Sequence, residues 1–288
     1  MNSSQQARAE AFRQLHDAAE PLVLTNVWDV ASARIVESGG ARAIGTTSAG
    51  MAWSLGYADG EQLPVAELLD ACRRICRAVA VPVTVDIEHG YGRDANETGA
   101  LVDALIQLGV VGINIEDGIA PESGELRAAS DLVERIAAAR AVARDHDLSF
   151  FINARIDTYI ALASGEARFA ETLKRALVYV DAGADGIFVP GLADPAEIAQ
   201  LAQQLPVPLN AYVGYAGAPS VSTLRQLGVR RISLGCGPMQ ATMAHLARIA
   251  REALEEGRYD TMADHLMSVS EANNLFPRHE RIVADALA

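Results

Sequence analysis

Short apolar runs recur along this chain, and several of them follow a turn that contains glycine. Four such runs come after a helical pattern that ends at glycine, at 43–45, 112–115, 186–189 and 231–234. Glycine suits the left-handed position that ends a helix, and a continuous apolar run is typical of a strand buried on both faces. Four more runs lie between these, at 22–25, 83–87, 150–156 and 209–213. The pattern therefore predicts eight strands.

Amphipathic helical patterns separate the apolar runs, for example at 64–80 and 130–144. Strict alternation of strand and helix predicts a parallel sheet, and eight such units favour a closed (β/α)8 barrel over an open doubly wound sheet. No Gly-x-Gly-x-x-Gly follows the first strand, which argues against a dinucleotide-binding fold. We expect residues 1–288 to form one α/β domain, a TIM-type barrel, with C-terminal helices at about 241–288.

Composition limits the function further. Hydrophobic residues make up 50% of the chain, and the net charge is −13, which argues against a nucleic-acid partner. An acidic protein that binds an anion needs local positive potential from a metal, an arginine or backbone N–H groups. The three cysteines offer no second pair for a zinc site and no disulfide framework, which suits a reducing compartment. With neither a signal-peptide pattern nor an apolar run of membrane length, we expect a soluble cytoplasmic protein.

Three successive predicted strands end in polar residues, and in each strand these residues occupy alternate positions, so that they face the same side. The third strand ends with Asp86 and Glu88, the fourth with Asn114 and Glu116, and the fifth with Arg155 between Asn153 and Asp157. Alternate residues of a strand face the same side, and a barrel places its active site at these ends. Carboxylates that share one site repel unless a cation or a proton lies among them. We therefore predict a site for Mg²⁺, with Mn²⁺ as an alternative.

Other candidates lie near these strand ends. Arg155 is the only arginine that the pattern places at an inward strand end, where it needs carboxylates, a substrate or both around it. A small-residue turn at 46–50 offers backbone N–H groups that can bind a carboxylate, although such residues also form ordinary turns. Asp59 lies in a loop from which it could reach the cation through water. His89 faces the other way by parity, so we expect a structural role; for Asp117 and Asp157, a role in the site and helix capping both remain open.

These motifs resemble the isocitrate lyase and phosphoenolpyruvate mutase superfamily, from about Leu24 to Glu256. The most specific segment, Asp86–Gly92, is similar to the superfamily's Asp-x-Asp/Glu-x-Gly-Tyr/Phe-Gly metal segment. The resemblance implies Mg²⁺ held largely through waters, with ligands Asp86, Glu88 and Glu116 and with Asp59 in the outer shell. It also implies that a late helix is exchanged within a homo-oligomer, a dimer or tetramer. The predicted substrate contacts are Trp28, Ser48, Ala49, Gly50, Asp86, Arg155 and Asn210.

Two departures from the superfamily pattern narrow the reaction. Lyases of this kind carry Lys-[Lys/Arg]-Cys-Gly-His after the Glu-Asp pair, whereas the stretch 118–126 here contains no cysteine. The paired asparagines of the mutase loop are absent as well. The resemblance therefore favours the decarboxylase or hydrolase branches.

We predict a Mg²⁺-dependent carbon–carbon lyase that acts on a small 2-oxo dicarboxylic acid through a pyruvate-type enolate, most simply an oxaloacetate-type decarboxylase. Its catalytic residues would be Arg155, Glu116 and Tyr212, with Tyr215 or a metal-bound water as other possible proton donors. Two alternatives stay open. One is a P–C bond enzyme, either a phosphonopyruvate hydrolase or a phosphoenolpyruvate mutase, and the other is a non-catalytic protein that binds a 2-oxo acid.

Overall fold

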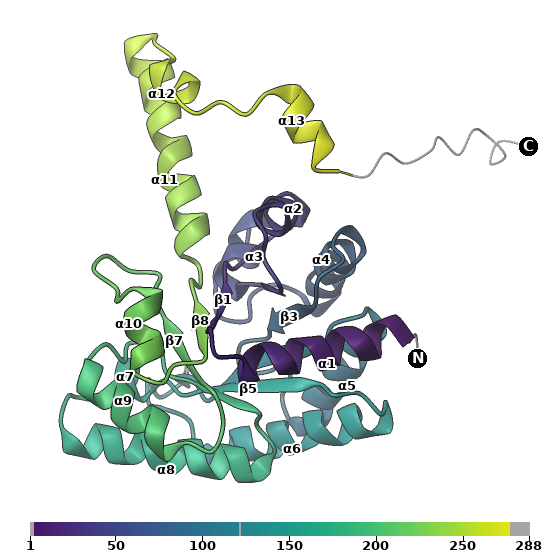
Figure 1. The fold of residues 1–288 in the computed structure, drawn as a ribbon, viewed down its shortest axis with the longest axis vertical. Coiled ribbons are helices and arrows are strands. Elements are labelled where there is room, and N and C mark those ends of the chain that lie inside the picture. The colour runs from purple at the N-terminus through teal and green to yellow at the C-terminus, as the bar shows by residue number, and fades with distance from the viewer. Residues whose placement is uncertain (1–2, 121, 277–288) are drawn as a thin grey trace, which may run out of the picture.

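Eight parallel strands form a barrel in the computed structural model, which describes residues 3–120 and 122–276 (Figure 1). The strands are ordered β1-β8-β7-β6-β5-β4-β3-β2, and an isolated parallel bridge between Val27 and Thr46 joins the first to the second. The predicted (β/α)8 barrel is therefore confirmed. The strands are β1 (Leu22–Leu24), β2 (Ile44–Gly45), β3 (Val83–Asp86), β4 (Gly112–Glu116), β5 (Phe151–Arg155), β6 (Gly186–Phe188), β7 (Leu209–Tyr212) and β8 (Arg231–Ser233).

Helices surround the barrel and join successive strands. Several begin where the sequence supplies a cap, as at Asp94, whose carboxylate accepts the N–H groups of Asn96 and Glu97. The helices around the barrel are α1 (Ser3–Asp17), α2 (Val30–Ser38), α3 (Ser48–Ser54), α4 (Val65–Ala78), α5 (Ala95–Gln107), α6 (Ala129–Asp145), α7 (Thr158–Ala161), α8 (Glu166–Ala182), α9 (Pro195–Gln204) and α10 (Val221–Gln226).

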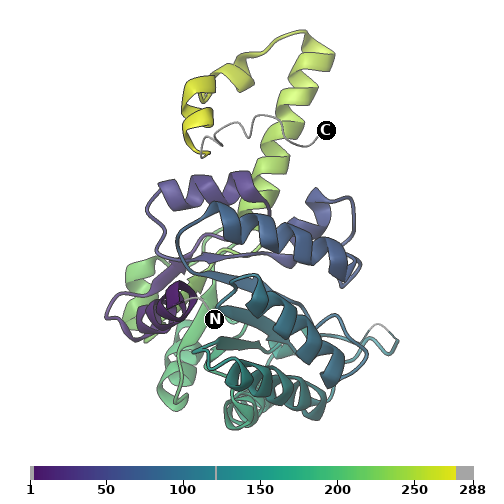
Figure 2. The same cartoon turned by 90° about the vertical axis from the view of Figure 1, so that its right-hand side faces the viewer.

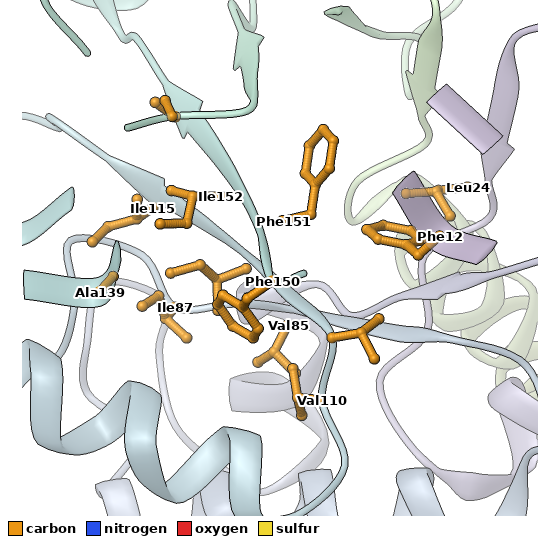
Figure 3. Close-up of a cluster of buried hydrophobic side chains, with 14 of the residues drawn as sticks. Phe12, Leu24, Val85, Ile87, Val110, Ile115, Ala139, Phe150, Phe151 and Ile152 are labelled. Atoms are coloured by element: carbon orange, nitrogen blue, oxygen red, sulfur yellow. The ribbon is translucent and has the colours of Figure 1, made fainter. Parts of the chain in front are cut away.

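The core fills both the barrel and the layer between strands and helices. Figure 3 shows Val85, Ile115 and Ile152 from adjacent strands among these buried side chains. At the amino-terminal end of the barrel, α1 inserts Phe12, whose ring lies 5.6 Å from the Phe151 ring in an edge-to-face arrangement. Helix α1 therefore covers the end of the barrel opposite the predicted site.

The C-terminal helices leave the barrel as an arm (237–276). It comprises α11 (Gly237–Arg251), a π-helical turn η1 (Glu252–Glu256), α12 (Asp260–Ala263) and α13 (Val269–Asn274). Figures 1 and 2 show α11 extending beyond the barrel and α13 turning back towards α2, where Arg34 donates to the Leu275 carbonyl. No residue of α11 is buried. The arm confirms helices in the predicted region up to Asn274, and residues 277–288 of that prediction lie outside the described residues.

Within the residues that the structure describes, no helix has the length and hydropathy needed to cross a membrane.

Candidate active site

A cavity of about 240 Å³ opens at the carboxyl ends of the strands. This is the end of a (β/α)8 barrel at which active sites form, because the loops that follow the strands converge there. The structure brings six predicted site residues to its wall: Ser48, Ala49, Asp59, Asp86, Arg155 and Tyr212. These residues come from five different parts of the chain, and only the closed barrel places them together.

Arg155 lies among carboxylates at the end of β5. Its Nη1 is 2.7 Å from a Glu116 carboxylate oxygen, and its Nε and Nη2 donate to the two oxygens of Asp157 at 2.7 and 3.0 Å. Burial acts to lower the pKa of Arg155, but Glu116 and Asp157 more than offset this and raise it. The guanidinium is therefore a fixed positive charge at the cavity.

Asp86 ends β3 and is held by the segment that follows β2. Its carboxylate accepts the Ser48 N–H at 3.3 Å, and its own N–H donates to Thr46 Oγ1 at 3.0 Å. Burial raises the pKa of Asp86, whereas Arg155 opposes that rise. A buried acid of this kind binds a cation readily, because the ion relieves the cost of its charge.

The small-residue segment predicted as a turn is instead the first turn of α3. Ser48, Ala49 and Gly50 are its first three helical residues, whose N–H groups have no partner within a helix. Asp86 takes the Ser48 N–H, and Ala49, whose N–H is also at the start of the helix, lines the cavity wall. A helix N-terminus favours an anion, which keeps a carboxylate-binding role open for this segment.

Three other predicted substrate contacts lie behind the cavity wall. A Cβ on Gly50 would lie 3.1 Å from the Trp28 Cβ, so these two residues pack against each other. Asn210 is buried, and its amide exchanges two hydrogen bonds with the Ser233 hydroxyl, at 3.0 and 3.1 Å. The structure thus places Trp28, Gly50 and Asn210 as supports for the wall rather than as part of it.

Glu88 lies at the edge of the site, in a turn whose backbone is strained. Strand β3 ends at Asp86, so the parity that we used to place Glu88 does not apply, and its φ is +50°. Its carboxylate accepts the Glu61 N–H at 2.7 Å and the Tyr91 hydroxyl at 2.6 Å, and burial raises the pKa of Glu88 to about 7. Glu61, Glu88 and Tyr91 all have positive φ, and such strain gathers at functional sites.

The acidic residues fit a cation bound through water better than one bound directly. Among the described residues, no three His, Cys, Asp or Glu side chains lie close enough together to hold a metal. The charges of Asp86, Glu88 and Glu116 nevertheless act on one another, and Asp59 acts on Glu88. Mg²⁺ usually keeps several of its waters. These acids could therefore hold a Mg²⁺ only through its waters.

Asp117 is structural, which resolves the question that the sequence left open. It is fully buried, and it accepts the Asp157 N–H at 2.9 Å, Arg175 Nη1 at 2.9 Å and the Tyr179 hydroxyl at 3.0 Å. It thereby holds the end of β5, where Asp157 orients Arg155. His89 is structural too, with Nδ1 2.7 Å from the Glu116 carbonyl oxygen.

Comparison with known proteins identifies the family. A sequence model described as phosphoenolpyruvate phosphomutase matches residues 12–254, which include all eight strands. The chain belongs to this family. It therefore lies in the isocitrate lyase and phosphoenolpyruvate mutase superfamily, which the sequence motifs resemble.

Relatives of this family member carry different names. An uncharacterized protein of Mycobacterium tuberculosis, Rv1998c, is 38% identical over 249 residues, which are 86% of this chain and 90% of the relative. The 2-methylisocitrate lyase of Aeropyrum pernix is 29% identical, with coverage of 96% and 89%. The oxaloacetate decarboxylase of Pseudomonas fluorescens is also 29% identical, with coverage of 98% and 95%.

Solved structures agree on the fold. A structure from Burkholderia cenocepacia J2315 has a TM-score of 0.82 and 40% identity, and the match covers 86% of this chain and 99% of that one. The phosphoenolpyruvate phosphomutase from Streptomyces platensis has a TM-score of 0.81 and 26% identity, with coverage of 93% and 94%. Lyases, decarboxylases and mutases thus share this fold, so the reaction has to be argued from the site.

The segment after Glu116 brings no proton donor of the lyase type to this family member. Ile119 and Leu126 form an antiparallel bridge, and Arg127 donates from its N–H to the Gly118 carbonyl at 3.1 Å. The residues between them include no cysteine, histidine or lysine.

Sequence reasoning missed several residues of this wall, among them Asn26 and Cys236, and it named Asn114 at a strand end without giving it a role. Asn114 carried a usable signal, because it shares a strand face with Glu116. Cys236 follows β8, and its thiol lies within hydrogen-bonding reach of the Tyr212 hydroxyl. The sequence did not indicate a second buried arginine, Arg231, which begins β8 and is buried inside the barrel.

Proposed function

We propose that this protein is a Mg²⁺-dependent enzyme that acts on a small 2-oxo dicarboxylic acid through a pyruvate-type enolate, most simply by decarboxylating oxaloacetate. The observation that carries the proposal is Arg155, fixed by Glu116 and Asp157 at a cavity of about 240 Å³ beside buried Asp86. A small cavity with one fixed cation and a group of acids suits a small anion that chelates a metal.

Metal binding, charge stabilisation and proton donation would fall to different residues of the site. Asp86, Glu88 and Glu116, with Asp59 farther out, would hold Mg²⁺, which when bound withdraws charge from the 2-oxo group. Arg155 would hold the negative charge that develops on the substrate oxygen when the bond to the departing carboxylate breaks. The electron pair of that bond becomes the enolate of pyruvate, CO₂ leaves, and C3 then takes one proton. Tyr212 or Cys236 would deliver it, a role that their place in the cavity wall supports.

Burial supports Tyr212 as a donor rather than a base. It raises the pKa of Tyr212 and of Cys236, so both groups stay protonated at neutral pH. In the structure the Tyr212 hydroxyl donates to the Gly214 carbonyl at 3.1 Å. The hydroxyl would have to leave that carbonyl in order to donate to a substrate carbon.

Pyruvate formation from oxaloacetate tests the proposal. Oxaloacetate decarboxylates slowly by itself and faster with Mg²⁺, so each rate is compared with a blank of the same metal content and with Arg155→Met. We expect the wild-type rate to be well above the rates of the blank and of Arg155→Met. EDTA should abolish this turnover, and excess Mg²⁺ should restore it. Turnover that persists in EDTA would contradict the role of the metal. Tight binding of 2-oxo acids without turnover would favour the non-catalytic alternative.

A second candidate is P–C bond chemistry, which the family description and the similarity to a phosphoenolpyruvate phosphomutase favour. The same enolate would form when the C–P bond of phosphonopyruvate breaks. Phosphate release from phosphonopyruvate, together with no turnover of oxaloacetate, would decide for this candidate.

A further inference from the structure

Arg231 crosses the interior of the barrel beneath the site. It lies on β8, pairs in register with Leu22 and Asn210, and is only 1% exposed. Its Nη2 donates to Asn114 Oδ1 at 2.9 Å. Strand β4, which carries Asn114, is four strands from β8 in either direction around the closed barrel. This hydrogen bond therefore connects opposite walls.

The Arg231 guanidinium keeps its charge without a paired carboxylate. No acidic side chain in the described part of the chain forms a salt bridge with it, and its Nε and Nη1 have no hydrogen-bond partner there. Burial lowers the pKa of Arg231 to about 9, and Asp86 acts in the opposite direction. The group is thus still protonated at neutral pH, which places a positive charge under the cavity floor.

This arginine fixes which way the Asn114 amide points. A guanidinium can only donate, so the Asn114 atom that faces it must be Oδ1. Asn153, the register partner of Asn114 on β5, donates from Nδ2 to the same Oδ1 at 2.9 Å. Turning the Asn114 amide over would set its NH₂ against the guanidinium, which cannot accept, and against the Asn153 NH₂ unless that amide, whose Oδ1 has no hydrogen-bond partner, turned over too. Its orientation is therefore determined by its neighbours.

The opposite end of that amide faces the cavity. Asn114 lines the cavity wall beside Asp86 and Arg155, and its Nδ2 makes no hydrogen bond with any residue that the structure describes. An NH₂ group held in this way is a fixed donor. It favours an oxygen that accepts, such as that of a carboxylate or carbonyl, and a ligand without one would leave the donor unpaired.

We propose that Arg231 is a positioning residue which, with Asn153, locks the Asn114 amide so that its NH₂ donates to an oxygen of the bound oxo acid. The proposal rests on the proposed function, since it assumes that the cavity binds such an acid. It assigns Asn114 to substrate recognition and gives the buried charge of Arg231 a purpose at the site.

Calorimetric binding of oxalate in the presence of Mg²⁺ tests this, because oxalate offers acceptor oxygens and needs no turnover. We expect Arg231→Met and Asn114→Leu each to weaken oxalate binding about tenfold or more, as for loss of a charge-supported hydrogen bond. The double variant should be no weaker than the poorer single variant. Arg231→Lys should recover part of the affinity, because lysine also only donates.

The matched control is Arg230→Met, whose side chain lies outside the barrel near the Ala19 carbonyl. It should leave the oxalate affinity within about twofold of wild type. If Arg231→Met lowered the melting temperature but kept that affinity, the arginine would only stabilise the barrel and the proposal would be overturned.

A second readout separates this inference from the proposed function. If the wild-type protein bound neither oxalate nor pyruvate, the proposed function would fail. A double-mutant cycle of Arg231→Met and Asn114→Leu in urea unfolding needs no ligand. Energetic coupling between the two sites would still support the fixed amide, and additive effects would overturn it.

Discussion

Arg155 and Glu116 are register partners on neighbouring strands, and their side chains meet as an ion pair with Nη1 2.7 Å from the carboxylate. The barrel sets this relationship, because β4 and β5 run parallel and end at the same level. Burial acts to raise the pKa of Glu116 well above its usual range, and Arg155 opposes this. The net effect favours the protonated acid, so a cation bound beside the pair would be needed to hold Glu116 as a carboxylate.

Arg155→Lys should lower kcat/KM for the substrate by roughly a hundredfold or more, because an ammonium cannot hold Asp157 with two parallel bonds and also reach Glu116. Steady-state pyruvate formation measures the change. The control is Arg225→Lys, the same substitution in an exposed pair with Glu20, which should leave the rate unchanged. Equal kcat/KM values for wild type and Arg155→Lys would mean that the two parallel hydrogen bonds from the Arg155 guanidinium to Asp157 have no role in catalysis.

Asp117→Asn should destabilise the fold by about 3 kcal/mol, because its buried NH₂ would face a donor that the carboxylate accepts and Arg175 would keep only the partly exposed Glu171 as a paired carboxylate. Urea unfolding measures the free energy. For comparison, Asp103→Asn removes the partner of half-buried His146 and should cost less than about 1 kcal/mol. A similar loss in both variants would show that the Asp117 network contributes little to the stability of β5.

His16 should make the protein less stable in acid. Burial, with a smaller effect from Arg231, lowers the pKa of His16 to about 3, and its ring stacks on Phe151 with centroids 4.0 Å apart. The unfolded chain binds this proton at about pH 6.5, so stability is full above that pH and falls by up to about 1.4 kcal/mol per unit below it.

A comparison of wild type with His16→Gln by urea unfolding isolates this effect. The measurements run from pH 7 to pH 4, with on the order of one measurement per half pH unit. The free energy of unfolding of the variant should fall less steeply with decreasing pH, by the slope that uptake of about one proton on unfolding produces. His265→Gln, in the exposed arm, should follow the wild-type curve. Parallel curves for wild type and His16→Gln would show that His16 is not the group responsible.

The arm (237–276) should bury its apolar side chains against a second copy of the chain. Leu246 and Leu254, two apolar residues of this arm, are 64% and 86% exposed, and exposed apolar surface of this kind marks interaction sites. We expect Leu246→Glu with Leu254→Glu to reduce the mass measured by light scattering to that of a monomer. Leu177→Glu, at an exposed position on α8, should not. A wild-type protein that is already monomeric would contradict this expectation.

The strands and the helices around them were predictable from the sequence. A parallel barrel buries its strands on both faces, so each strand appears in the sequence as an apolar run. The placement of Asp86 and Arg155 at one end of the barrel was predictable for a related reason, since both residues fall at strand ends in the same phase. Glu88 was placed by the same rule for the wrong reason: β3 stops two residues earlier, and a turn with positive φ orients the side chain instead.

Local sequence also determined the caps, the glycine turns and the absence of a lyase-type cysteine after Glu116, because each of these depends only on neighbouring residues. The contacts across the barrel were decided by the tertiary structure alone. Arg231 reaches Asn114, 117 residues away, only because closure brings opposite strands within the length of one side chain. No pattern along the chain encodes that distance.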